Sequence, residues 1–447
     1  MGLQYTFKIT FVSALLLNIL ACSPVAFKAA NETSEKVTAI KPTPPPLNPN
    51  LPYDPNAPIP GFQPMDFRNM VLAGYQGWFS TPGDGQLNRW GHWSAGNSPA
   101  PNRITFEQYP NVSEYPAASL VTTDLGPLGN GQPSKLFSSF HPGVVDTHFR
   151  WMSEYGIDGV CSGRFMVATY SSVELAARNK MVELIKKYAH YYRRYFYISY
   201  DLTNARLDSL EADLTRDWTN ELDGRLSVTA SPVYARTSGK PVIMLWGIDG
   251  GSMNQALALK LVRFFKNRGF YVIGGTQWGW RDNHAWHEVY RELSMIQPWS
   301  VGAYASDEDT ENFHKGVAVP DRQFLDANWG IDYQKVISPG FAWSNWGGGP
   351  RNPFSRRGGD YMWHQAYWAS EVSDGALIAM FDEYDEATAI AKSAENASQA
   401  PQSQYFLTLD ADGVSVSSDF YLRLTGEITK LMRGARSRVF NVPIPRR

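Results

Sequence analysis

Short apolar segments alternate with longer amphipathic stretches from residue 70 to residue 434. Each apolar segment has the length of a buried strand and ends in polar and aromatic residues. The stretches between them repeat apolar positions at helical spacing. The predicted strands are residues 71–79, 156–165, 196–203, 241–248, 270–278, 295–304, 335–345 and 376–384. The predicted helices are residues 146–155, 171–193, 207–222, 252–268, 284–293, 321–329, 359–373 and 417–434.

This alternation predicts a fold of the α/β class. Strands that alternate with helices pair in parallel, because a crossover helix returns the chain to the same end of the sheet. Eight such units predict a (β/α)8 TIM barrel, which we expect to fill residues 65–447 as one catalytic domain. An open, doubly wound sheet is the alternative, but no glycine-rich fingerprint follows the first strand.

The N-terminus has the features of an export signal. Lys8 precedes the apolar run of residues 9–20, which is too short to span a bilayer as a mature helix and leads into the tetrapeptide ILAC. We interpret residues 1–21 as a lipoprotein signal peptide, with lipidation of Cys22 after cleavage. An ordinary secretory leader is the alternative.

A proline-rich segment separates this signal from the barrel. Ten prolines lie between residues 41 and 64, so residues 22–64 are predicted to form an extended linker. We therefore expect a domain held off a bacterial outer membrane or cell surface by the lipid anchor at Cys22. A periplasmic location is the alternative.

Composition narrows the class of partner. The net charge is −2, from 41 basic and 43 acidic residues, so no bulk attraction to nucleic acid is expected. Cys161 is the only cysteine besides Cys22, which leaves the mature chain without an internal disulfide. We expect Cys161 to be a small buried residue. No cofactor and no metal are predicted.

Aromatic residues make up 14% of the chain and include 15 tryptophans. A barrel brings the C-terminal ends of its strands together on one face, where such residues would meet a substrate. Sugar C–H faces stack on aromatic rings, while sugar hydroxyls bond to carboxylates and amides. A carbohydrate is therefore the expected substrate, although any single tryptophan can also fill space between barrel and helices. The predicted substrate contacts are Tyr75, Trp78, Arg164, Asp201, Trp246, Trp278, Trp343, Asn345 and Asp385.

The last predicted strand ends in the segment MFDEYDEATAI, residues 380–390, which holds four carboxylates within five positions. Crowding of like charge raises at least one pKa toward the range of a general acid. Hydrolysis of a glycosidic bond needs one protonated and one ionised carboxyl group. Solvated acids and a divalent-cation site are the alternatives.

Strand geometry limits which carboxylates can cooperate. In a continuous strand Glu383 and Asp385 share a face, whereas Glu383 and Glu386 point to opposite faces. The two glutamates can reach one substrate only if the strand breaks between them.

Six segments resemble bacterial relatives of glycoside hydrolase families 71 and 99, over residues 70–434. They are LAGYQGWFSTPGDG, YGIDGVCSGRF, YDLTN, GKPVIMLWG, ISPGFAWSN and MFDEYDEATAI. Family 99 contains retaining endo-α-mannosidases and endo-mannanases on a (β/α)8 barrel, and family 71 relatives are α-1,3-glucanases. The family 99 motif on strand eight has the form NEWHEGT. On that pattern Glu383 falls on the residue that deprotonates the sugar 2-hydroxyl to give an anhydro-sugar intermediate, and Glu386 falls on the general acid/base.

This sequence departs from that motif at four positions. Asp382 replaces Asn, Tyr384 replaces Trp, Asp385 replaces His and Ala387 replaces Gly. The two glutamates keep their places. The resemblance therefore implies a glycosidase, of retaining type, that cleaves a polysaccharide or oligosaccharide. The altered motif leaves open the alternative of a non-catalytic glycan-binding surface lipoprotein.

Overall fold

The computed structural model describes residues 52–447. The predicted signal peptide, Cys22 and the linker up to residue 51 lie outside these residues. Across residues 52–447, no helix combines the length and the apolar character that crossing a bilayer requires.

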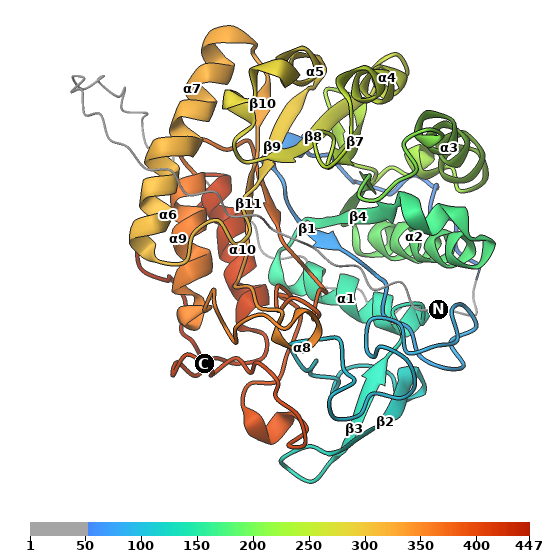
Figure 1. The fold of residues 1–447 in the computed structure, drawn as a ribbon, viewed down its shortest axis with the longest axis vertical. Coiled ribbons are helices and arrows are strands. Elements are labelled where there is room, and N and C mark those ends of the chain that lie inside the picture. Colours follow the sequence, from blue (N-terminus) through green and yellow to red (C-terminus); the bar gives the residue numbers. More distant parts are fainter. Residues whose placement is uncertain (1–51) are drawn as a thin grey trace. The chain divides into compact units, whose positions relative to one another are not determined.

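Nine parallel strands form a nearly closed barrel at the centre of the domain (Figure 1). In hydrogen-bonding order they are β10 (Asp332–Tyr333), β9 (Met295–Trp299), β8 (Tyr271–Gln277), β7 (Lys240–Trp246), β5 (Tyr195–Asp201), β4 (Gly159–Phe165), β1 (Val71–Tyr75), β12 (Ala376–Ile378) and β11 (Lys335–Ile337). Only Gln334 separates β10 from β11, and its backbone N–H donates to the Ile296 carbonyl of β9 at 3.0 Å. The two therefore act as one strand that links β9 to β12. The predicted TIM barrel is confirmed.

Helices surround the barrel on its outer side (Figure 1). They are α1 (Pro142–Tyr155), α2 (Ser172–Tyr192), α3 (Leu210–Arg216), α4 (Gln255–Lys266), α5 (His287–Glu292), α6 (Asp307–Phe313), α7 (Val319–Asn328), α9 (Asp360–Ala369) and α10 (Phe420–Met432). Each predicted helix has a counterpart among them. Helix α6 was not predicted, although Ser306 and Asp309 begin it with a reciprocal capping box.

Long loops after β1, β11 and β12 meet at the C-terminal ends of the strands. The first carries the hairpin of β2 (Leu120–Pro127) and β3 (Pro133–Phe137), and the second carries the short helix α8 (Ser344–Gly347). Figure 1 shows both elements at the same end of the domain. Isolated bridges join Pro110 to Ser393 and Leu128 to Pro401, so the first and last loops support each other.

The last part of the predicted linker packs on the domain. The Tyr53 hydroxyl lies 2.6 Å from His190 Nδ1, and the Phe62 ring tilts against Tyr195 at 5.5 Å between centroids. Apolar side chains between the prolines therefore find partners at the end of α2 and the start of β5. Residues 53–62, which lie within the predicted linker, thus contact the domain.

Cys161 lies within β4 and is buried. Burial raises the pKa of its thiol to about 12. It is the small buried residue that the sequence predicts.

Candidate active site

The segment after β12 folds back on itself and carries the four carboxylates at its tip. The Met380 backbone N–H donates to the Thr388 carbonyl at 2.9 Å, and the Thr388 N–H donates to the Glu383 carbonyl at 3.2 Å. Strand β12 ends at Ile378, so the predicted strand 376–384 is shorter than expected. Glu383 and Glu386 therefore lie on one turn, and the opposite faces of a continuous strand do not separate them.

Asp382 ties this turn to the end of β1. Its carboxylate is fully buried and accepts hydrogen bonds from the backbone N–H groups of Gln76 and Gly77, both at 2.8 Å. These bonds take the place of further strand pairing and end β1 at Tyr75. Gly77 has φ +54°, and a Cβ there would lie 2.7 Å from Met181 Sδ, so the approach requires glycine. Burial raises the pKa of Asp382 to about 7, while the two N–H donors oppose this rise.

Glu383 is buried and receives two side-chain hydrogen bonds. Gln76 Nε2 donates to its Oε1 at 3.2 Å, and Thr388 Oγ1 donates to its Oε2 at 3.0 Å. Burial raises the pKa of Glu383 well above its usual range, and the charges of Glu386 and Asp385 add to the rise. Glu383 is thus held in one position by residues from two loops.

Glu386 has a different environment on the same turn. Its side chain is half-buried, and no group within residues 52–447 hydrogen-bonds to its carboxylate. Burial raises its pKa to about 7, and the charge of Asp385 contributes to this. Each ionised glutamate opposes ionisation of the other, so the pair holds a proton more tightly than an isolated carboxyl group.

Asp385 joins two aromatic rings from the loop after β1. Its Oδ1 accepts from Trp78 Nε1 at 3.3 Å, and its Oδ2 lies 2.9 Å from His92 Nδ1. The rings of Trp78 and His92 stack with centroids 4.1 Å apart and planes 4° from parallel. The His92 side chain is 42% exposed, so the His92 ring of this pair reaches solvent.

Gln76 and His92 were not among the predicted site residues. Gln76 adjoins the predicted contact Tyr75, but its side chain turns toward the carboxylates whereas that of Tyr75 does not. Nothing in the local sequence around His92 indicates that its loop reaches the carboxylate turn after β12.

Four other predicted contacts lie at or just beyond the C-terminal ends of strands. Trp246 ends β7 and packs edge-on against Trp299 at 5.7 Å, and Trp278 follows β8 with 49% of its surface exposed. The four are Asp201, Trp246, Trp278 and Trp343. The hydrogen bonds and ring contacts of these four side chains are to residues other than the four carboxylates.

Arg164 and Tyr75 belong to the layer between barrel and helices. Arg164 is fully buried, and its guanidinium donates to Asp217 at 3.0 Å and to Asn179 at 2.9 Å. The Tyr75 hydroxyl lies 2.8 Å from His148 Nδ1, and the side chain is 1% exposed. Because neither side chain reaches solvent, neither is placed to contact a substrate, contrary to the prediction.

Asn345 holds α8 in place. Its side-chain amide donates to the carbonyls of Phe106 and Tyr405 at 3.0 and 2.9 Å and accepts from Gln404 at 3.0 Å. Its backbone N–H donates to Glu107 at 2.8 Å. These bonds fix the side chain in the frame of the loops, and its role as a substrate contact stays a prediction.

Cation binding was the alternative reading of the carboxylates. Among residues 52–447, no group of three or more His, Cys, Asp or Glu side chains has the arrangement of a metal site.

The fold has counterparts among solved structures. The GH99 endo-alpha-mannosidase from Bacteroides thetaiotaomicron matches with a TM-score of 0.56 at 14% identity, over 82% of this chain and 98% of that one. The same enzyme in complex with bis-tris-propane gives a TM-score of 0.55. A glycoside hydrolase-like protein gives a TM-score of 0.50 at 14% identity, over 83% of this chain and 97% of that one. No family model and no curated protein matches the sequence. The chain therefore shares the TIM-barrel fold of these proteins over most of its length.

Proposed function

We propose that this protein is a glycosidase that cleaves glycosidic bonds in a polysaccharide or oligosaccharide, with Glu383 and Glu386 as its catalytic pair. The observation that carries the proposal is the carboxylate turn after β12, where two glutamates with raised pKa values lie at the mouth of the barrel in unlike environments. The fold shared with a GH99 endo-alpha-mannosidase supports it.

The two environments favour a division of labour. Glu383 accepts hydrogen bonds from Gln76 and Thr388, and such bonds stabilise the ionised carboxylate. Glu386 accepts none from residues 52–447 and has a pKa of about 7, so about half of these groups carry a proton at neutral pH. Burial and the charges of Glu386 and Asp385 raise the pKa of Glu383 as well. The role of Glu383 as the base at the sugar 2-hydroxyl therefore rests on the family 99 pattern. Glu386 protonates the leaving oxygen and afterwards deprotonates water, as the family 99 pattern implies for a retaining enzyme.

Aromatic faces near the pair provide surfaces for sugar rings. The stacked rings of Trp78 and His92 lie beside the turn, with Asp385 bonded to both. Trp278 at 49% exposure and Trp346 at 38% are the most exposed tryptophans among residues 52–447. We assign Trp78, Trp278 and Trp343 to sugar stacking and Asp201 to hydroxyl binding, and Trp246 contributes to the same wall.

The test is a reducing-sugar assay on a panel of α-mannans, α-glucans, xylans and arabinans. On the substrate that is cleaved, Glu383→Gln and Glu386→Gln should each lower turnover by about a hundredfold or more, with binding largely kept. Asp385→Asn is the matched control and should be milder. If Asp385→Asn is the crippling change and Glu386→Gln is mild, the catalytic pair is assigned wrongly.

A leaving group that needs no protonation separates the two roles. On an aryl or fluoride glycoside, Glu386→Gln should regain much of its first-step rate, whereas Glu383→Gln should not. Parental activity of both variants on the natural substrate would remove the mechanism.

A non-catalytic glycan-binding lipoprotein is the second candidate, and the altered motif favours it. Tyr384, in place of the family Trp, is buried and packs its ring against Phe79 and Trp93, so it offers no face to a sugar. Binding on the same panel without product on any ligand would favour capture over cleavage.

We also propose that lipid on Cys22 anchors the protein to the outer membrane or the cell surface. The support is the export segment and its ILAC end in the sequence. The chain between Cys22 and Tyr53 then serves as the tether.

A further inference from the structure

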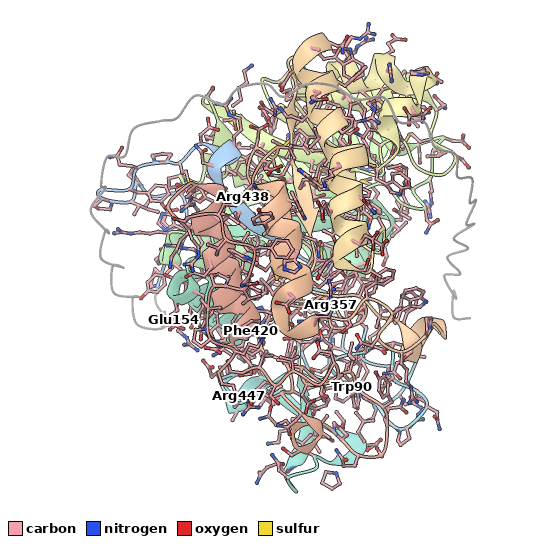
Figure 2. The ribbon with its side chains drawn as sticks, turned by 90° about the vertical axis from the view of Figure 1, so that its left-hand side faces the viewer. Trp90, Glu154, Arg357, Phe420, Arg438 and Arg447 are labelled. Carbon is pink, nitrogen blue, oxygen red and sulfur yellow. The ribbon has the colours of Figure 1, made fainter. Side chains whose placement is uncertain are left out.

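A small cavity lies between the barrel and its helices, and none of its lining residues belongs to the candidate active site. Its lining includes Thr310 of α6, Phe313, His314, Lys335 of β11, and Gln365 and Trp368 of α9. Figure 2 looks onto the helices that cover this side of the barrel. The cavity has room for a single small particle, because the volume open to the centre of a water-sized sphere is about 10 Å³.

Two buried hydrogen-bond donors in this lining have no partner among residues 52–447. They are Nζ of Lys335 and Nε1 of Trp368. Lys335 is 6% exposed, and its ammonium group lies over the Phe313 ring, 4.3 Å from the ring centroid. A buried donor without an acceptor destabilises a fold, and more so when it is charged. The cavity therefore lacks an acceptor.

The nearby polar groups are already committed to other partners. The Gln365 side chain exchanges hydrogen bonds with the backbone of Ser338 at 3.1 and 2.9 Å. The Thr310 hydroxyl donates to the Ser306 carbonyl at 2.8 Å. Neither residue has an acceptor directed to the Lys335 ammonium by a hydrogen bond.

The carboxylate that acts on Lys335 is also committed. Burial lowers the pKa of Lys335 to about 8, and the charge of Asp321 opposes the shift, so the ammonium form persists at pH 7. Asp321 itself bonds to Arg281 at 2.8 Å and to Trp280 and Tyr333, both at 3.1 Å. Its charge is therefore balanced by Arg281.

The other carboxylate on this side is Glu371. It lies 2.6 Å from His314 Nε2 and forms an ion pair with Arg438, which Figure 2 labels. Burial lowers the pKa of His314, which keeps that ring neutral at pH 7. With Arg281 paired to Asp321 and Arg438 paired to Glu371, no carboxylate among residues 52–447 forms a hydrogen bond or an ion pair with Lys335.

We propose that this cavity binds one small monatomic anion, such as chloride, between the ammonium group of Lys335 and the indole N–H of Trp368. The anion accepts from both donors and neutralises the buried charge. Because the cavity has room for only one small particle, it favours a monatomic ion over a polyatomic oxyanion. Since Lys335 begins β11, the anion stabilises the strand that links β9 to β12. The inference does not depend on glycosidase activity.

Thermal unfolding at constant ionic strength tests this site. Sodium gluconate is replaced stepwise by sodium chloride or sodium bromide, and the Tm is followed. The Tm should rise with halide concentration, by about 3 °C at a concentration a hundred times the dissociation constant for a domain of this size. The rise should vanish in Lys335→Met and shrink in Trp368→Phe.

Lys260→Met is the matched control, because the Lys260 side chain is 61% exposed and pairs with Glu211 on the surface. It should keep the full halide response. A parent Tm that does not respond to halide, or a response that survives Lys335→Met, would overturn the proposal.

Bromide diffraction on the parent protein avoids any folding defect of the variants. Crystals grown in sodium bromide should show an anomalous peak in direct contact with Lys335 Nζ, as a charge-assisted hydrogen bond requires. An absence of that peak at saturating bromide would also overturn the assignment.

Discussion

Replacing Glu386 with glutamine should stabilise the folded domain at neutral pH while it abolishes most of the turnover. Burial, aided by the charge of Asp385, raises the pKa of Glu386 from 4.5 to about 7. A pKa shift of roughly 2.5 units lowers the free energy of unfolding by about 3 kcal/mol once the group is ionised. Because the side chain is half-buried and glutamine keeps its own desolvation cost, about 1–2 kcal/mol should be recovered. For a domain of roughly 400 residues this is about 1–2 °C in Tm.

The pH dependence identifies the cause. A carboxyl group whose folded pKa is raised contributes stability that is present in full below the unfolded pKa and is lost as pH rises through the folded pKa. The stability gap between Glu386→Gln and the parent should therefore open between pH 4.5 and pH 7 and stay constant above it.

Calorimetric melts from pH 4 to pH 8.5 measure this gap, with the exposed Glu308→Gln as the matched control. Glu308→Gln should show little change across the range. A gap that does not vary with pH, or a Glu386→Gln variant less stable than the parent at pH 8, would refute the reasoning about the buried carboxyl group.

Three further predictions concern the anchor, the linker and the ring pair. Cys22→Ala should move the protein from the detergent phase to the aqueous phase in a partition experiment, and unchanged partitioning would contradict the lipid anchor. Deleting residues 22–51 should leave the Tm within about 1 °C, whereas a deletion through Phe62 should lower it by roughly 3 °C or more, because aromatic contacts on the domain are lost. His92→Gln keeps a donor for Asp385 but removes the stacked ring, so KM should rise about tenfold with a smaller change in kcat; an unchanged KM would show that the ring does not meet the substrate.

The alternation of strands and helices predicted the barrel, because that pattern is set by local periodicity and by the handedness of crossovers. The direction of individual side chains was harder to predict. Strands of a parallel barrel are buried on both faces, so their sequences do not alternate between apolar and polar residues and do not show which side chains point into the barrel. The sequence therefore predicts Arg164 at the mouth of the barrel, although its side chain points outward to Asp217.

Contacts between distant loops were beyond the sequence for a different reason. His92 reaches Asp385 across 293 positions, and Asn345 reaches the carbonyl of Phe106 across 239. Neither local propensity nor residue type carries that pairing. A strand break between Glu383 and Glu386 was predicted only as a condition for both glutamates to act. The strand ends earlier, at Ile378, and hydrogen bonds within the turn place the two glutamates.

The four carboxylates of the turn after β12 have unequal environments. Asp382 accepts hydrogen bonds from backbone N–H groups of the loop after β1. Asp385 bonds to the rings of Trp78 and His92, so both carboxylates fix the turn in place. Asp385 also raises the pKa of Glu383 and of Glu386 by its charge, and Asp382 contributes to that of Glu383. These two positions are Asn and His in the family 99 motif. The same substitutions that weaken the sequence resemblance therefore add negative charge that favours a proton on the pair, which is the state that a general acid requires.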